Sequence, residues 1–177
     1  INNMLGSRLQ EITQKGNAPF LFAQSSYGPY QGGLVWGISA FQTAAVAKTT
    51  ADLQKAMIAA LAENERMAKF GFTQGEIETI KKKLDAGLEK QYKEKDKTKS
   101  AVYVQQYLEN FLTGASIPSA EYSYTEAKKI IKDLTAADIN AVAKKLIGNT
   151  NQIIVVQAPE KDAKDLPTEA QLIAALK

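Results

Sequence analysis

The sequence contains no cysteine and no histidine among its 177 residues. Without cysteine, neither a disulfide nor a thiolate metal site can form, although this leaves the cellular compartment open. Histidine is the commonest metal ligand and the usual general base near neutral pH. Its absence excludes the zinc motifs H-E-x-x-H and H-x-x-E-H and a Ser-His-Asp triad.

Long apolar runs and a strong charge imbalance are also missing. No run approaches 18 apolar residues, so no membrane-spanning helix is predicted. The 22 basic and 19 acidic residues leave a net charge of +3, spread along the chain. We therefore expect no nucleic-acid partner and no membrane insertion. The length predicts a single domain over residues 1–177.

What the chain does have is helical periodicity, with apolar residues three and four apart and glycine or proline at the ends of the segments. The chain opens inside such a pattern, and we expect it to be part of a longer protein. The predicted helices lie over 1–16, from Thr49 or Thr50 to Gly71, over 73–92, 102–114, 119–134 and 135–148, and after Pro167.

The sharpest local signal is the joint between the second and third predicted helices. Gly71 suits a helix end, and Thr73 with Glu76 forms a T-x-x-E capping box. Phe72 and Ile77 stand at the positions of a hydrophobic staple around that cap. Thr135 with Asp138 and Thr168 with Gln171 predict two further helix starts. These signals concern folding and carry no chemistry.

Two short runs, Phe20–Tyr27 and Leu34–Phe41, predict a β-hairpin around the glycine-rich segment 28–33. One face of the second run should meet the core; it holds Leu34, Trp36, Ile38 and Ala40. The continuous apolar run Ile153–Gln157 predicts a third, buried strand. The fold expected is α+β, a two-layer arrangement with helices on one face of a small, mainly antiparallel sheet whose first strand is missing upstream.

Three patterns resemble functional sites but have simpler interpretations. Gly28 and Gly33 have phosphate-loop spacing, yet Leu34 replaces the required lysine and a strand follows instead of a helix. Lys81 to Lys83 lie among carboxylates at i, i+4, such as Glu78 with Lys82 and Glu89 with Lys93, which favours a solvated helix face. Five tyrosines suit either a peptide groove or helix packing, and packing is favoured: Tyr92, Tyr103, Tyr107, Tyr122 and Tyr124.

Several segments together resemble the pitrilysin/insulinase-like zinc peptidases, the family of insulin-degrading enzyme and mitochondrial processing peptidase. These segments are Leu5-Gly-Ser-Arg-Leu9, the hairpin, Glu65-Arg66, Gly71-Phe72-Thr73 with Glu76, Glu89 to Lys97, Leu134-Thr135 with Asp138-Ile139-Asn140, Ile153 to Lys161, and Leu166-Pro-Thr-Glu169. Their order is similar to that of the second domain of long, four-domain bacterial members.

The resemblance implies paired α/β domains that enclose a peptide, with zinc on an H-x-x-E-H motif in the first domain. This chain lacks the histidines, so it resembles an inactive domain. The family's last domain often carries an Arg and a Tyr seven residues apart after the S-R-L segment. Thr13 and Phe20 stand at the corresponding positions here, with a one-residue gap, and neither can polarise a carbonyl. This favours the second domain over the last.

The leading hypothesis is a non-catalytic structural and chamber domain of a zinc endopeptidase, with no catalytic, cofactor-binding or metal residue of its own. Zinc is expected in the preceding domain of the parent protein, and the partners are other domains of the same polypeptide and the parent enzyme's peptide substrate. The resemblance to exported enzymes of Gram-negative bacteria implies the periplasm. The alternatives are a scaffold module of the same family without enzyme activity and a free-standing helical adaptor.

Overall fold

The computed structural model describes residues 1–30, 37–148 and 151–175. The fold is α+β, as predicted: it is mostly helical, and its described strands form one two-stranded antiparallel sheet. The chain forms two compact units, residues 1–73 with 136–177 and residues 74–135. The expectation of one domain over residues 1–177 stays a prediction.

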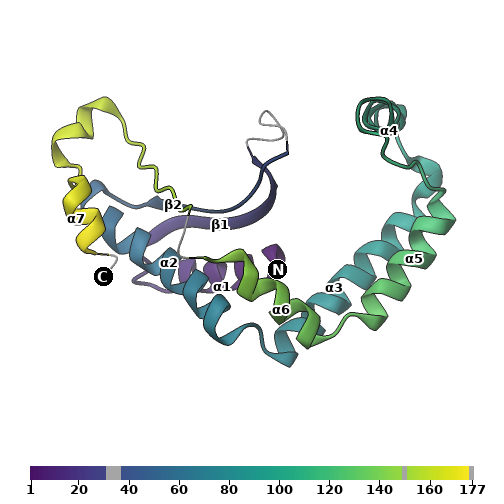
Figure 1. Cartoon of the computed structure of the whole chain (residues 1–177), viewed down its shortest axis with the longest axis horizontal. Helices are drawn as coiled ribbons and strands as arrows, with labels where there is room; N and C mark the ends of the chain where they lie inside the picture. The colour runs from purple at the N-terminus through teal and green to yellow at the C-terminus, as the bar shows by residue number, and fades with distance from the viewer. Residues whose placement is uncertain (31–36, 149–150, 176–177) are drawn as a thin grey trace. The chain divides into compact units, whose positions relative to one another are not determined.

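The first unit carries the sheet, and its helices cover one face of it (Figure 1). Its elements are α1 (Asn2–Thr13), β1 (Phe20–Pro29), β2 (Ser39–Ala47), α2 (Leu53–Phe70), α6 (Ala136–Leu146) and α7 (Glu169–Ala174), with 3-10 turns at Thr50–Asp52 and Glu160–Asp165. α1 packs against β1, α2 against β2, and α6 against α2. Leu5 and Leu9 of α1, Phe20 of β1 and Met67 of α2 are fully buried and form the centre of this core.

The hairpin exists, but its second strand lies further along the chain than predicted. β2 covers Ser39–Ala47 rather than Leu34–Phe41, and it pairs with β1 from Phe20 opposite Ala47 to Pro29 opposite Ser39. The prediction that Ile38 faces the core is wrong, since its side chain is 52% exposed. Leu34 and Trp36, with residues 31–33 of the expected turn, lie outside the described residues.

The expected third strand, Ile153–Gln157, is not formed in the described structure. The prediction that this run is buried is also wrong, because Ile153 is 82% exposed and Val155 is 72% exposed. A strand is stabilised by ladder hydrogen bonds to a neighbour. An apolar run therefore favours the interior of a sheet. It forms a strand only where a partner strand lies beside it.

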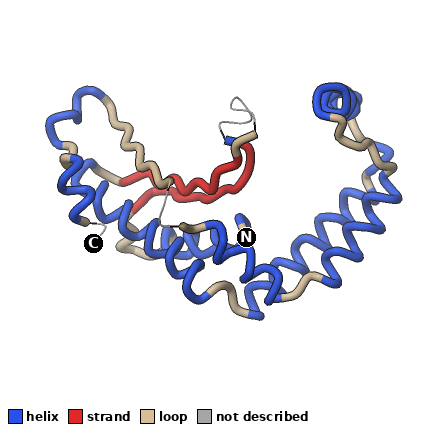
Figure 2. Tube along the Cα trace, in the orientation of Figure 1, coloured by secondary structure: helices blue, strands red, loops and turns tan. Residues whose placement is uncertain are grey.

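The second unit is built on a helical hairpin. It contains α3 (Gln74–Lys93), a 3-10 turn at Lys95–Lys97, α4 (Ser100–Thr113) and α5 (Ala120–Asp133), and α3 packs along α5 (Figure 2). Lys81 of α3 donates to the carbonyl oxygens of Lys132, at 2.8 Å, and Leu134, at 2.9 Å. These are carbonyls that a helix end leaves without partners, and a cation there also suits the helix dipole.

Helix ends follow the local signals closely. α2 ends before Gly71, whose φ of 69° is positive as expected, although its ψ of −153° lies outside the left-handed helical region. α4 ends at Gly114 in the left-handed conformation, and Thr168 with Gln171 forms the predicted capping box at α7. α3 begins directly after Thr73 and α6 directly after Thr135, where the sequence places their starts.

Candidate functional site

A group of buried and part-buried polar contacts in the first unit surrounds the end of α2. The Arg8 side chain comes from α1 and is only 6% exposed. Its Nη2 donates to the carbonyl oxygen of Gly71 at 2.9 Å, and its guanidinium lies 4.6 Å from the ring centre of Phe72. Because guanidinium keeps its charge at any ordinary pH, Arg8 holds backbone and ring in place rather than transferring protons.

Asn140 of α6 completes this arrangement from the other side. Its Oδ1 accepts from the backbone N–H of Phe72 at 2.7 Å, and its Nδ2 donates to the Phe72 carbonyl oxygen at 3.1 Å. A carboxamide offers one acceptor and two donors, so it satisfies both backbone groups of one residue as a neighbouring strand would. We call Arg8, Gly71, Phe72 and Asn140 the α2 joint. These hydrogen bonds hold the chain in place where it leaves α2.

The second unit holds the main cluster of titratable groups, at the contact of α3 with α5. Lys128 donates to Asp85 Oδ1 at 2.7 Å and to Glu89 Oε1 at 2.9 Å. Tyr124 donates its hydroxyl to the same Glu89 oxygen at 2.5 Å, and its ring stacks on Tyr92 with centres 4.2 Å apart. The spacing in the sequence predicts a pair between Glu89 and Lys93. In the structure Lys128 forms the ion pair with Glu89, and Lys93 acts on Glu89 through its charge.

The pKa shifts in this cluster move the pKa values of Glu89, Tyr124 and Lys128 further from pH 7. The hydrogen bond from Tyr124, followed by that from Lys128, lowers the pKa of Glu89. The bond to Glu89, with burial second, raises the pKa of Tyr124, and the bonds to Asp85 and then Glu89 raise the pKa of Lys128. A general acid or base needs a pKa near the working pH. The cluster therefore suits a fixed clamp between two helices better than acid/base catalysis.

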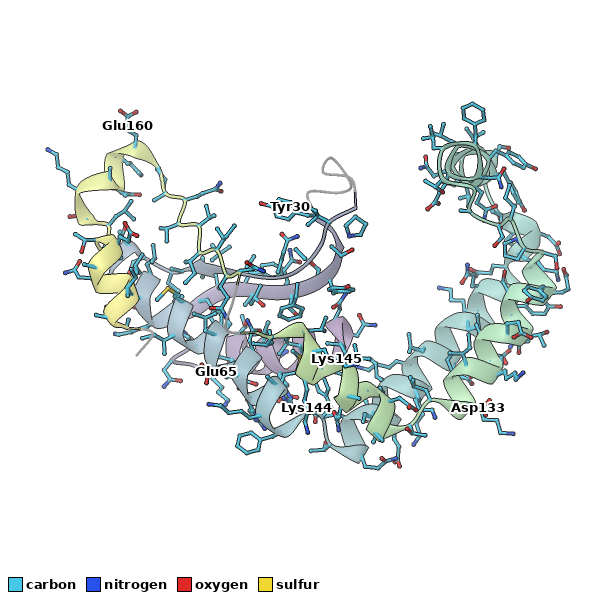
Figure 3. The ribbon with its side chains drawn as sticks, viewed as in Figure 1. Tyr30, Glu65, Asp133, Lys144, Lys145 and Glu160 are labelled. Atoms are coloured by element: carbon cyan, nitrogen blue, oxygen red, sulfur yellow. The ribbon has the colours of Figure 1, made fainter. Side chains whose placement is uncertain are left out.

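A shallow hollow lies beside this clamp on α5. It is lined by Asp85, Lys128, Lys129, Ile131, Lys132 and Asp133. Asp133 marks the end of α5 in Figure 3. Lysines and carboxylates are mixed along its wall, so it offers no concentrated charge to a ligand. A ligand site of the usual kind is a concave, mainly apolar cavity with a few converging polar groups, which this hollow does not resemble.

Thr13 and Phe20, the two positions that the sequence comparison singles out, both have structural roles. Thr13 closes the end of α1 by donating its hydroxyl to the carbonyl oxygen of Leu9 at 2.9 Å. Phe20 is fully buried in the core of the first unit.

The tyrosines divide into two groups. Tyr92 and Tyr124 stack between α3 and α5, as helix packing predicts. Tyr103, Tyr107 and Tyr122 are 44%, 61% and 62% exposed, so helix packing does not explain them in the described structure. The sequence does not separate the groups, because helical spacing reports the face on which a residue lies but not what covers that face.

The described ranges contain neither a metal site nor a membrane span. No three Asp or Glu side chains there converge in a group that would hold a metal ion. None of the helices described is long and apolar enough to cross a membrane.

Comparison with known proteins yields structural neighbours only. No family model and no curated protein matches the sequence. The chain resembles the crystal structure of the first half of the periplasmic protease PqqL from Escherichia coli, with a TM-score of 0.72 and 17% identity over 98% of this chain and 36% of that one. It also resembles the PqqL structure itself, with a TM-score of 0.74 and 18% identity over 98% of this chain and 19% of that one. At this identity the likeness concerns the fold, and the chain spans about a third and a fifth of these two neighbours.

Proposed function

We propose that this chain is a non-catalytic domain of a pitrilysin/insulinase-like zinc endopeptidase, packing beside the zinc-bearing domain and forming part of the wall around the peptide. Its contribution is positional: it supports a catalytic geometry that another domain of the same polypeptide holds. The observation that carries the proposal is the fold likeness to a bacterial protease over 98% of the chain. The periplasm is the corresponding proposal for location, since both neighbours are periplasmic proteases.

The donor set of this chain does not fit the family's zinc ion. That ion is held by histidine nitrogens and a carboxylate, and the sequence has no histidine and no cysteine. Some of the described carboxylates form ion pairs on helices instead, such as Asp85 and Glu89 with Lys128. We therefore assign zinc to the preceding domain of the parent protein and derive no reaction step in this chain.

The open face of the sheet supports a role beside another domain. Ala23 and Phe20 are buried on the helix side, whereas Phe22 and Val46, paired across the two strands, are 52% and 53% exposed. Ile153 adds a further large apolar side chain to the exposed set. Exposed apolar patches usually mark a surface that another domain or protein covers. This counts against the alternative of a free-standing helical adaptor.

The main alternative is a scaffold module derived from the same family, in which no domain of the parent protein keeps zinc. The chain itself does not distinguish this from the peptidase hypothesis, since its part would be structural in both. The parent's preceding sequence does. An H-x-x-E-H motif about one domain before Ile1 supports the peptidase, and a parent without that motif supports the scaffold.

The direct test uses the purified chain. We expect it to bind no stoichiometric zinc by atomic absorption after dialysis and to cleave no quenched-fluorescence peptide. The parent protein should cleave the same peptide and lose that activity with a chelator. Equimolar, tightly held zinc in the purified chain, or turnover by it, would overturn the assignment as a non-catalytic domain.

A further inference from the structure

The two units of the chain differ in how much apolar surface each of them buries. Leu5, Leu9, Phe20 and Met67 fill the core of the first unit and are fully buried. In residues 74–135, all of which the structure describes, Ile77 is the single apolar side chain that is buried. Burial of apolar surface is the main favourable contribution to folding. The second unit therefore has little of it to offset the entropy lost when its backbone is ordered.

The helices of the second unit gain little stability from their own sequences. Isolated helices of up to about 15 residues are marginal in water even when they are rich in alanine. α4 and α5 have 14 residues each, and neither buries a side chain in the described structure. The contact of α3 with α5 must therefore supply much of the stability of this unit.

The clamp at the contact of α3 with α5 is mainly polar. Lys128 bonds to Asp85 and Glu89, and Tyr124 bonds to Glu89 while it stacks on Tyr92. The side chains of Lys128 and Glu89 are each 35% exposed, and that of Asp85 is 43% exposed. Water weakens ion pairs at such sites, so each of them adds little to stability. A clamp of this kind opens more easily than a buried apolar core.

The point where the chain leaves the first unit is held from within that unit. The chain leaves after Phe72 and returns in α6. Asn140 of α6 bonds to both backbone groups of Phe72, and Arg8 of α1 bonds to Gly71. All four residues belong to the first unit. If residues 74–135 lost their structure, these bonds could remain, and the segment would become a long loop closed between Phe72 and Asn140.

We propose that residues 74–135 open as a separate cooperative unit, which unfolds and refolds while the sheet and helices of the first unit stay native. The clamp between α3 and α5 keeps this unit closed. Proteins open in contiguous units of different stability, and lids and other moving elements come from the least stable of them. Residues 74–135 are such an element, and they would be one whether the parent protein is a peptidase or a scaffold.

Hydrogen exchange, followed by mass spectrometry, tests the separate opening in the full chain. We expect the most protected amides of α3 and α5 to be protected at least about tenfold less than those of α2. Their exchange should accelerate together as urea rises, because one opening exposes them all, but less steeply than the exchange of α2. Protection in α3 and α5 as strong as in α2, or exchange there that does not respond to urea, would overturn the proposal.

Two matched glycine variants test whether the opening leaves the first unit native. Ala60→Gly removes a buried methyl group from α2 and weakens that helix, so the protection of α2 should fall about fivefold or more. The protection of α3 and α5 should not change, since the first unit is native before and after they open. Ala127→Gly in α5 should instead lower the protection of α3 and α5 about fivefold. An equal fall throughout the chain in Ala60→Gly would mean that the chain opens as one unit.

A pair of tyrosine variants on α5 tests the clamp. Tyr124→Ala removes the stacking on Tyr92 and the bond to Glu89, and should lower the protection of α3 and α5 about threefold or more. Tyr122→Ala makes the same change of residue at a site that is 62% exposed, and should alter protection less than about twofold. Equal effects of the two substitutions would show that Tyr124 does not hold the unit closed.

The Tyr124→Ala variant remains informative even if its second unit no longer folds. The amides of α3 and α5 would then lose their protection altogether, while those of α2 and β1 should stay protected. Loss of protection in α2 and β1 as well would contradict separate opening, because the first unit would then depend on the second for its own structure.

Discussion

Asn140 satisfies both backbone groups of Phe72, although the two residues lie 68 positions apart. The carboxamide of α6 thereby fixes the point where the chain leaves α2. The guanidinium of Arg8 holds the preceding residue, Gly71, from the α1 side. Side chains of α1 and α6 thus bond to the same short stretch of backbone at the end of α2. These contacts fix the conformation of the chain at that point.

Replacing Asn140 with Ala should reduce the free energy of unfolding by about 1–3 kcal/mol, because it leaves the N–H and C=O of Phe72 without partners. Urea denaturation monitored by circular dichroism measures this. Asn110→Ala is the matched control, since the Asn110 side chain donates to the nearby Ala115 carbonyl at an exposed site and its loss should cost much less. Equal decreases in the free energy of unfolding would show that the part-buried bonds to Phe72 contribute no more than the exposed bond of Asn110.

Replacing Gly71 with Ala should be destabilising for two separate reasons. Its φ of 69° is strained for any residue with a Cβ, and a Cβ built there overlaps the Asn140 carboxamide. We expect a loss of about 2 kcal/mol or more in the same urea experiment. Gly87→Ala is the control: this helical glycine has open space around it, so alanine should stabilise by up to about 1 kcal/mol.

The two changes should not be additive. In an Asn140→Ala background, the carboxamide that an added methyl group at position 71 would displace is already gone, so Gly71→Ala should cost less than in the natural chain. Full additivity in this double-mutant cycle would mean that backbone strain alone explains the glycine.

The helix boundaries were predictable from sequence because caps act locally. Gly114 and the Thr168 box each involve residues within one turn, and the structure places both where the sequence does. The joint at Gly71 was recognised by the same signals. The role of Asn140 is not predictable in this way, because no local sequence pattern links it to Phe72, 68 residues away.

The same distinction explains the errors in the sheet. Ile153–Gln157 has the composition of a buried strand, but strand formation depends on a partner that composition does not reveal. In the second unit, Glu89 has a lysine four residues away, and it pairs instead with Lys128 across the helix contact. For Glu89, the lysine on the facing helix and not the one four residues along the chain makes the ion pair.

Replacing Arg8 with Lys should reduce stability by about 1–3 kcal/mol, although the charge is kept. Lysine lacks the planar fork that donates to Gly71 while lying over the Phe72 ring. Arg66→Lys is the matched control, because Arg66 is an exposed residue paired loosely with Glu63 at 3.4 Å, and it should change stability by less than about 0.5 kcal/mol. Urea midpoints of the two variants decide the question; similar shifts would mean that charge at position 8 is sufficient.

The Glu89 clamp should make the stability of the second unit dependent on pH in two separate ranges. The pKa of Glu89 is lowered by folding from its ordinary 4.5, so its contribution is present above that value and lost as pH falls through the lower folded pKa. The pKa values of Tyr124 and Lys128 are raised from 10.0 and 10.5, so their contributions are present below those values and lost as pH rises above them. Between about pH 5 and 10 the clamp should contribute steadily.

Replacing Glu89 with Gln tests the acid range, because glutamine keeps an acceptor for Tyr124 but removes the charge. The variant should therefore flatten the acid side of the stability profile. Urea denaturation followed by tyrosine near-ultraviolet dichroism, at neutral pH and at pH about 3, gives the difference between variant and natural chain. That difference should shrink toward acid pH as Glu89 becomes protonated in the folded and unfolded states alike; a constant difference would show that the Glu89 charge does not hold α3 to α5.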